Sequence, residues 1–360
     1  MAATKSSLHC AKPSWILLLV CTFLLCSHLG ATASGEVQHE DRQLTGSAPS
    51  TLGDNLERRT LEHDGLIRHF LERRPNSFVA GTSGVLILLH GGTQSMVDIF
   101  EDSQPGTRRW LTVSDSAGFL LLAPNGIEKR RLFFGLGQEV TITDGDSQNW
   151  NDLRSDVDLS DADDVGFLAA LVQWAIDERQ VDASKVYITG ASNGGMMTHR
   201  MLLERPELFA AGASTISNLP VSPVPMPASP RPILLMNGDA DPIVPWEGGT
   251  VRRNRGVVRS ALATRDFFVM LNGAVASSAD MLPDTDPGDG CRISREEFSS
   301  TTPVTFLTMV GGGHVYASTD EPQLGFFASI INRIFNLTGN FCNDADFADL
   351  AWDFMSQHSL

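Results

Sequence analysis

The chain has 360 residues and a formal net charge of −16 at pH 7, with 27 Lys and Arg against 43 Asp and Glu. Such an acidic chain disfavours nucleic acid and anionic membranes as partners, because both carry negative charge themselves. The length could hold two domains, but large α/β folds often use a comparable length for one.

The N-terminus is predicted to be a signal peptide that covers residues 1–33. Lys5 and Lys12 provide a positive start, Trp15–Cys26 is apolar, and Ala31–Ala33 offers small residues for cleavage. This apolar run is shorter than the roughly 20 residues that span a bilayer. An uncleaved anchor is the alternative. After cleavage, we expect a secreted, extracellular protein without a membrane partner.

Only two cysteines, Cys291 and Cys342, follow the signal peptide. An even pair in an oxidising compartment predicts one disulfide. Neither cysteine belongs to a C-x-x-C motif, so we expect no thiolate metal site, and we expect no cofactor. Asn336 begins the single Asn-x-Ser/Thr sequon and is a predicted glycosylation site if the host glycosylates.

Residues 34–57 are polar, rich in turn formers and without apolar periodicity, which predicts a flexible leader. The ordered pattern begins just after it, so residues 58–360 are predicted to form one domain. Residues 60–73 resemble two short strands joined at Asp64-Gly65, a dipeptide typical of hairpin turns.

Further along the chain, short apolar runs alternate with segments of helical spacing such as residues 161–180. This alternation predicts an α/β fold with a mainly parallel sheet and helices on both faces. Residues 274–296 show no clear period and are expected to form a loop, and residues 344–357 to form an amphipathic helix. The predicted buried strands are residues 85–90, 119–124, 186–188, 209–217, 232–238 and 304–313.

The segment 190–194, Gly-Ala-Ser-Asn-Gly, fits the pattern G-x-S-x-G between a predicted strand and a predicted helix. In this context the pattern describes a nucleophile elbow, in which a sharp turn exposes the serine. Only small residues fit two positions before and after it. The pattern therefore predicts Ser192 as a nucleophile, and an ordinary strand–turn–helix corner is the alternative.

A serine nucleophile needs a base, and that base needs an orienting acid. His314 follows three glycines at the end of a predicted strand and is the expected base. Asp241 follows the end of another strand and is the expected acid. Asp239 remains an alternative acid, although a residue at its position is commonly part of a turn.

The oxyanion formed during acyl transfer needs backbone donors. His90-Gly91-Gly92 follows an early strand, where this arrangement supplies one donor, and the residue after the nucleophile supplies the other. Gly92 and Asn193 are therefore the predicted oxyanion hole, and His90 is expected beside the substrate. Taken alone, these residues could also form a simple turn.

Together these segments resemble secreted α/β-hydrolase esterases of the polyhydroxybutyrate depolymerase and feruloyl esterase group, from about Thr60 to Ser359. The resemblance rests on TLEHDGLIRHFL, LLHGG, AGFLLLAPNG, ADDVGFLAAL, KVYITGASNGGMM, FAAGAST, NGDADPIVPWEGG and GGGH. It implies the α/β-hydrolase fold, the same Ser–Asp–His assignment, and a place for Trp150 near the acyl pocket. Relatives often have Trp-Pro where this chain has 315–317, and the stretch 317–341 is unusual.

The sequence thus predicts a secreted serine carboxylic-ester hydrolase that works through an acyl-enzyme. Its ester substrate would be a hydroxyalkanoate polyester or a feruloylated or acetylated plant polysaccharide, and the sequence leaves this choice and the oligomeric state open. The alternatives are a catalytically silent binding protein of the same fold and a serine peptidase.

Overall fold

The computed structural model describes residues 51–52, 55–131, 139–157, 160–227, 229–322 and 337–360. The chain divides into two units, Met1–Ser47 and Ala48–Leu360, and the first unit lies wholly outside the described residues. The predicted signal peptide, most of the predicted leader and Asn336 also lie outside them. Within the described part, no helix is long and apolar enough to cross a membrane.

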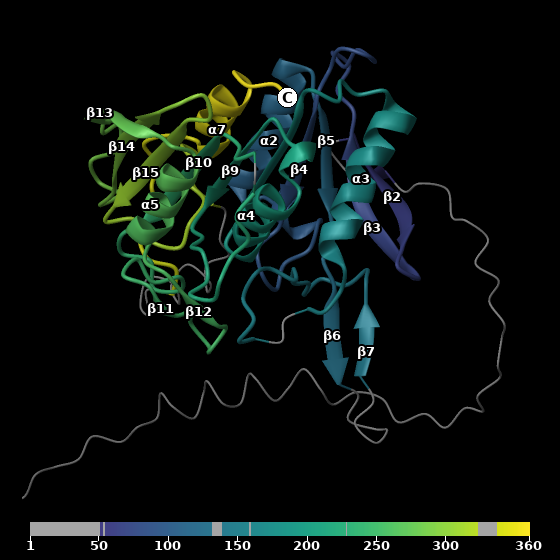
Figure 1. Cartoon of the computed structure of the whole chain (residues 1–360), viewed down its shortest axis with the longest axis horizontal. Helices are drawn as coiled ribbons and strands as arrows, with labels where there is room; N and C mark the ends of the chain where they lie inside the picture. Colours follow the sequence, from purple (N-terminus) through teal and green to yellow (C-terminus); the bar gives the residue numbers. More distant parts are fainter. Residues whose placement is uncertain (1–50, 53–54, 132–138, 158–159, 228, 323–336) are drawn as a thin grey trace, which may run out of the picture. The chain divides into compact units, whose positions relative to one another are not determined.

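A large sheet organises the second unit (Figure 1). Among the described residues it has eleven strands in the order β1-β2-β3-β5-β4-β8-β9-β10-β15-β14-β13. The strands from β5 to β15 run parallel, and the pairs at both ends are antiparallel. The strands are β1 (Thr51–Leu52), β2 (Leu56–His63), β3 (Leu66–Arg73), β4 (Val85–Leu89), β5 (Leu120–Pro124), β8 (Val186–Ala191), β9 (Ala211–Thr215), β10 (Ile233–Gly238), β13 (Val275–Met281), β14 (Arg292–Ser299) and β15 (Val304–Val310).

Among the described residues, two small hairpins stand apart from this sheet, and two 3-10 turns connect its elements. The hairpins are β6 (Glu128–Arg131) with β7 (Glu139–Ile142), and β11 (Gly249–Thr250) with β12 (Val257–Val258). The turns are η2 (Asp98–Phe100) and η3 (Pro206–Leu208).

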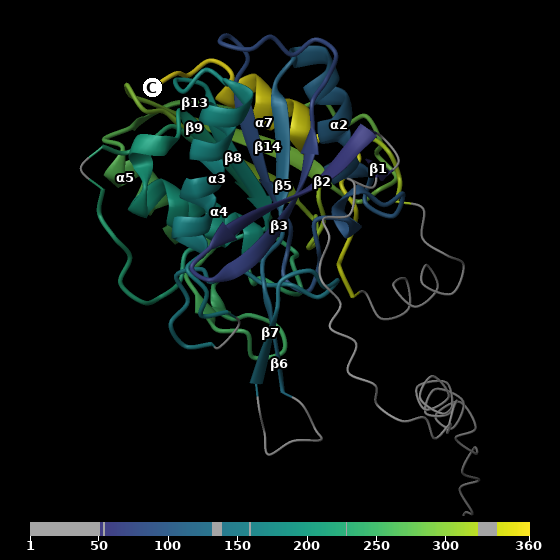
Figure 2. The same cartoon turned by 90° about the vertical axis from the view of Figure 1, so that its right-hand side faces the viewer.

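Helices cover both faces of the sheet, as the sequence predicted (Figure 2). Successive residues of β4 alternate between the two apolar cores, because neighbouring strand side chains point to opposite faces. Every residue of β4 and β5 is buried, which explains their continuous apolar sequence. One core contains α2 (Pro105–Ala117) and α7 (Phe347–Met355); the other contains α3 (Asp164–Arg179), α4 (Asn193–Glu204) and α5 (Ala261–Leu271).

The predicted hairpin at the start of the sheet is confirmed as β2 and β3. Asp64 and Gly65 join the strands and both have positive φ, at 50° and 73°. Both central residues of a type I′ turn require such φ values, which is why Asp-Gly is favoured there.

The prediction of a loop over residues 274–296 is wrong. Strands β13 and β14 pair in antiparallel register there, and β14 pairs with β15. Every residue of β13 is exposed, so this edge strand has no buried face and its sequence needs no apolar alternation. The pattern that identified the other strands is therefore missing.

A buried ion pair ties the hairpin to the helical layer. Arg68 of β3 donates to Asp164 of α3 at 2.6 Å, with at most 1% of either side chain exposed. The second carboxylate oxygen of Asp164 accepts from the amide of Asn151 at 2.8 Å. Burial raises the pKa of Asp164, and the Arg68 charge opposes this rise. The pair thus fixes the segment that carries Trp150.

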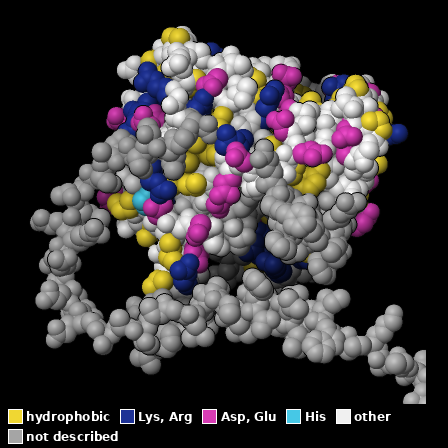
Figure 3. Space-filling view, turned by 180° about the vertical axis from the view of Figure 1, so that it is seen from behind, with side chains coloured by type: hydrophobic (Ala, Val, Ile, Leu, Met, Phe, Trp, Pro, Cys, Tyr) yellow, Lys and Arg dark blue, Asp and Glu magenta, His cyan; other side chains and the backbone are white. Residues whose placement is uncertain are grey.

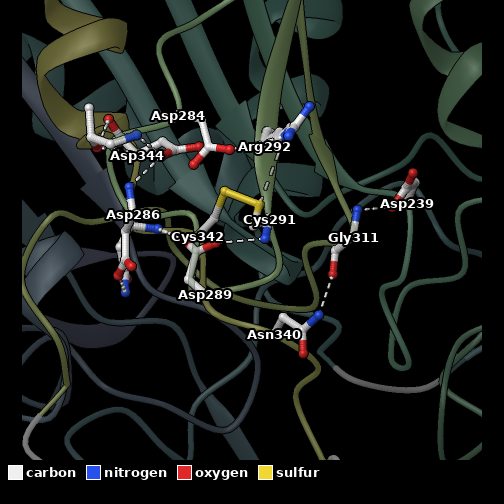
Figure 4. Close-up of a disulfide and its surroundings, with 12 residues drawn as sticks. Asp239, Asp284, Asp286, Asp289, Cys291, Arg292, Gly311, Asn340, Cys342 and Asp344 are labelled. Atoms are coloured by element: carbon white, nitrogen blue, oxygen red, sulfur yellow. Dashed lines mark hydrogen bonds and ion pairs between the residues drawn. A yellow bond between two sulfur atoms is a disulfide. The ribbon is translucent and has the colours of Figure 1, made fainter.

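The predicted disulfide joins Cys291, which directly precedes β14, to Cys342 ahead of α7, with their Cα atoms 5.2 Å apart (Figure 4). Asp289 reinforces the link, because its carboxylate accepts from the amides of Cys291 and Asn343 at 2.6 and 2.7 Å. The bridge therefore holds the chain before α7 against the antiparallel end of the sheet.

Replacing Cys291 and Cys342 together by serine is expected to lower the free energy of unfolding by about 2–4 kcal/mol, because the bridge reduces the conformational entropy of the unfolded chain. Denaturant unfolding of the variant and the parent chain measures this difference. Non-reducing peptide mapping should recover the two cysteine peptides linked, and alkylation of both without reduction would contradict the bridge.

Candidate active site

Ser192 occupies a strained turn between β8 and α4. Its backbone lies at φ 53° and ψ −121°, outside the regions that non-glycine residues ordinarily adopt. Its amide donates to the carbonyl of Thr215 in β9 at 3.0 Å, which fixes the turn at the carboxyl edge of the sheet. The predicted elbow geometry is therefore present.

The glycines around Ser192 are required by close backbone packing. A Cβ atom on Gly194 would lie 2.4 Å from the carbonyl oxygen of His90, and one on Gly190 would lie 2.6 Å from that of Gly194. Both distances are too short for any side chain. The first turn of α4 thus approaches the end of β4 as closely as the backbone allows.

The structure brings Asp241 and His314 together. The Nδ1 atom of His314 lies 2.7 Å from Oδ2 of Asp241. The other carboxylate oxygen accepts from the amides of Ile243 and Val244 at 2.7 and 2.9 Å. These bonds set the carboxylate so that Nδ1–H of the ring donates to it, which leaves Nε2 with a free lone pair.

Asp239, the alternative acid, faces a different group. Its carboxylate accepts from the amide of Gly311 at 2.6 Å, and the carbonyl of Gly311 accepts from Asn340 at 3.0 Å (Figure 4). Asp239 therefore supports the loop that leads to His314 without contacting the imidazole.

The loop that carries His314 packs on the segment that the disulfide holds. The amide of His314 donates to the carbonyl of Thr338 at 2.5 Å, and that of Gly313 to Asn340 at 3.0 Å. A Cβ on Gly313 would lie 2.0 Å from the Thr338 carbonyl, so glycine is needed there. The position of the imidazole thus depends on the segment around Thr338 and Asn340, more than twenty residues later in the sequence.

Gly92 and Asn193, the predicted oxyanion donors, lie side by side. A Cβ on Gly92 would stand 3.4 Å from Cβ of Asn193. Among the described residues, no hydrogen bond engages either backbone amide. Asn193 also begins α4, where the helix dipole favours negative charge.

Gly92, Ser192 and His314 line one pocket of about 570 Å³. Asp241 lies behind the imidazole, with 2% of its side chain exposed. In the part of the chain that the structure describes, no group of three or more His, Cys, Asp or Glu side chains could hold a metal ion.

His90 and Trp150, which were predicted beside the substrate, contact buried parts of the protein. Both side chains are buried, at 1% and 0% exposure, and neither lines the pocket. The Nε2 atom of His90 accepts from the amide of Gly126 at 2.9 Å, and Nε1–H of Trp150 donates to the His90 carbonyl at 2.9 Å. These bonds hold the segment His90–Gly92 from its buried side.

The role of the Asn193 side chain was not predicted from the sequence. Its Oδ1 accepts from the amide of Trp150 at 2.7 Å, and its Nδ2 donates to Asp152 at 2.7 Å. Asp152 in turn binds Arg154 at 2.6 Å, with both side chains buried. An amide next to the nucleophile was the only available signal, since these partners lie about forty residues earlier.

Asp241→Asn is expected to lower kcat by about 10³–10⁴-fold. Oδ1 of the new amide would keep the contacts with Ile243 and Val244, so its NH₂ group would face Nδ1 of His314. The imidazole would then carry its proton on Nε2, where it blocks deprotonation of Ser192. Hydrolysis of 4-nitrophenyl acetate measures the loss.

Asp239→Asn is the matched control, because its amide oxygen can still accept from Gly311. We expect less than a tenfold change in kcat, since the loop contact is kept. Equal losses in the two variants, or a larger loss in Asp239→Asn, would refute the choice of Asp241.

Two buried histidines are expected to make stability depend on pH. Burial lowers the pKa of His90 to about 4 and that of His199 to about 3, from 6.5. As the pH falls below 6.5, these histidines bind protons in the unfolded chain but stay neutral in the folded chain. The free energy of unfolding therefore decreases as the pH falls. Between pH 6.5 and 5.5, each histidine should cost about 1 kcal/mol.

Urea unfolding at a series of pH values tests this dependence. His199→Asn should show a shallower loss, because one of the contributing groups is gone. A free energy of unfolding that stays constant over this pH range would contradict the burial of neutral histidines.

Parts of the chain are similar to known proteins. Residues 138–221 match the prolyl oligopeptidase family. The putative esterase NocK of Nocardia uniformis subsp. tsuyamanensis is 32% identical over 206 residues, which are 52% of this chain and 58% of that protein. Acetylxylan esterase A of Aspergillus ficuum is 29% identical over 138 residues, 38% of each chain.

The matched segments span 58% and 38% of these two relatives, so their whole length is not represented. The solved acetyl xylan esterase from Aspergillus awamori is 16% identical and superimposes with a TM-score of 0.50 over 78% of this chain and 99% of that one. The mainly parallel sheet, its two helical layers and this likeness give the chain the α/β-hydrolase fold.

Proposed function

We propose that the chain is a serine carboxylic-ester hydrolase whose catalytic domain is residues 58–360. The observation that carries the proposal is the pairing of Asp241 with His314 at 2.7 Å in a pocket that also exposes Ser192 on a strained turn. The relatives named as esterases support it.

In the first half of the reaction, Nε2 of His314 takes the proton of the Ser192 hydroxyl while its oxygen attacks the ester carbonyl carbon. The carbonyl oxygen becomes an oxyanion and accepts hydrogen bonds from the amides of Gly92 and Asn193. The intermediate collapses, the bond to the alcohol oxygen breaks, and His314 protonates that oxygen. An acyl-serine and a free alcohol result.

In the second half, water replaces the alcohol. His314 takes a proton from the water as its oxygen attacks the acyl-serine, and the same amides hold the oxyanion. Collapse returns the proton to Ser192 and releases the carboxylic acid. Asp241 keeps the imidazolium in place during both halves and is not itself protonated.

For the substrate, we propose the acetyl ester of a saccharide hydroxyl. The relative from Aspergillus ficuum is named acetylxylan esterase A, which supports this substrate class. A secreted, extracellular protein is part of the proposal, and the disulfide between Cys291 and Cys342 supports it, since such bridges persist in oxidising compartments.

A peptidase activity is the second candidate, because residues 138–221 match the prolyl oligopeptidase family. That segment contains Ser192 but neither Asp241 nor His314. Cleavage of proline 4-nitroanilides faster than 4-nitrophenyl acetate would favour the peptidase.

Ser192→Ala is expected to abolish hydrolysis of 4-nitrophenyl acetate, with kcat reduced by about 10⁴-fold or more, because no other hydroxyl stands at the turn. Ser116→Ala, an exposed serine in α2, is the matched control and should retain full activity.

Trapping separates a lost nucleophile from a damaged fold. An organophosphate should add to one serine of the parent chain, and mass spectrometry should locate it on Ser192. Labelling at another serine, or hydrolysis that survives in Ser192→Ala, would overturn the proposed mechanism.

A further inference from the structure

Three arginines line the pocket of the proposed catalytic site. Arg252, Arg253 and Arg255 come from the loop between β11 and β12, and among the described lining residues only Asp320 carries a carboxylate. In the space-filling view, one group of basic side chains lies beside a hollow near the lower edge of the face (Figure 3). This local positive charge contrasts with the net charge of −16.

Arg255 lies directly against Gly92. Its Nη1 atom is 3.0 Å from the position that a Cβ on Gly92 would occupy. Burial, together with the charges of Arg154 and Arg253, lowers the pKa of Arg255. Its surroundings thus disfavour its positive charge, which an anion in the pocket would stabilise.

Two carboxylates lie near these arginines: Asp320 lines the same pocket, and Asp156 stands beside Gly256. No ion pair joins Arg253 or Arg255 to a described acid, and Asp152 pairs with Arg154. The pKa of Arg109 is raised chiefly by its hydrogen bond with Asp349, and the charge of Asp320 adds to this. Arg253 and Arg255 therefore line the pocket without an ion-pair partner among the described residues.

The loop that carries these arginines is held rigidly. Arg253 and Asn254 both adopt positive φ, at 63° and 55°, a conformation that is unfavourable for arginine. The amide of Arg255 donates to the carbonyl of Val251 at 3.1 Å. The guanidinium of Arg154 donates to the carbonyl of Arg255. Since Arg154 binds Asp152 and Asp152 binds Asn193, the loop is connected to the elbow itself.

We propose that Arg253 and Arg255 bind a carboxylate on the alcohol part of the substrate. The preferred substrate is then an acetylated saccharide that carries a uronic acid. This inference rests on the proposed function, because an acetyl group is too small to carry the carboxylate itself. Guanidinium groups suit this role, since their paired N–H donors match the two oxygens of a carboxylate.

The test uses two chromogenic acetates that differ only in charge. The carboxylate is 5-acetoxy-2-nitrobenzoate, and the neutral control is 5-acetoxy-2-nitrobenzamide. The parent chain should hydrolyse the carboxylate with at least a tenfold higher kcat/KM, corrected for the intrinsic reactivity of each ester. Raising the salt concentration should reduce this preference, because the interaction is between charges.

Arg255→Gln and Arg253→Gln should each lower the ratio of the two kcat/KM values, and the double variant should bring it near one. Arg255→Lys should keep part of the preference. Arg130→Gln removes the same charge from an exposed position on β6 and should leave the ratio unchanged. An unchanged ratio in the double variant would overturn the proposal.

A second substrate pair locates the anion. With 4-nitrophenyl hydrogen succinate and its methyl ester, the carboxylate sits on the acyl part, and we expect no preference that depends on Arg255. Such a preference would contradict the alcohol-side assignment.

Binding separates failure of this inference from failure of the proposed function. Calorimetry should detect 5-hydroxy-2-nitrobenzoate binding to Ser192→Ala protein, with at least tenfold weaker binding when Arg255→Gln is added. If the parent chain hydrolyses neither acetate, the proposed function fails and this measurement alone decides on the anion site. Binding that ignores Arg255 would refute the site even in an active esterase.

Discussion

The close approach of the first turn of α4 to the end of β4 is the constraint on which the rest of the site depends. With only 2.4 Å between the His90 carbonyl and the place of a Cβ on Gly194, the two backbones touch. The parallel register of β4 and β8, which sets Leu89 opposite Gly190, brings both turns to one edge of the sheet. Ser192 then has to adopt its strained conformation, and the amides of Gly92 and Asn193 become neighbours.

A second part of the sheet brings Asp241 and His314 together by the same geometry. In the pairing of β10 with β15, Gly238 lies opposite Met309, so the loops after both strands leave at that edge. Asp241 is fixed by backbone amides, whereas His314 is fixed by the segment around Thr338 and Asn340. The disulfide at Cys342 therefore helps to fix the position of His314 from outside the sheet.

The Asn193 side chain connects the end of β4 with the loop between β11 and β12. It accepts a hydrogen bond from the amide of Trp150, whose indole donates to the His90 carbonyl. It also donates to Asp152, which pairs with Arg154, and Arg154 in turn donates to the carbonyl of Arg255. Rigid support of this kind matters because an oxyanion hole works only when its donors are already in position. The same network compensates Arg154 and leaves Arg255 without such a partner among the described residues.

Local sequence alone determined the buried strands, the hairpin at Asp64-Gly65 and the turn at Ser192. Each depends on residues that are neighbours along the chain: buried parallel strands need continuous apolar runs, and sharp turns need glycine or a residue that tolerates positive φ. The edge strand β13 could not be predicted in this way, because none of its residues is buried and its sequence carries no apolar pattern.

The tertiary structure decided which side chains face the pocket. Asp239 and Asp241 are two residues apart and chemically identical, and only the packing of β10 against β15 turns one toward Gly311 and the other toward His314. His90 and Trp150 sit in motifs that suggested substrate contact, yet both rings are buried. A side chain's direction depends on contacts between segments far apart in sequence, and these contacts exist only in the folded chain.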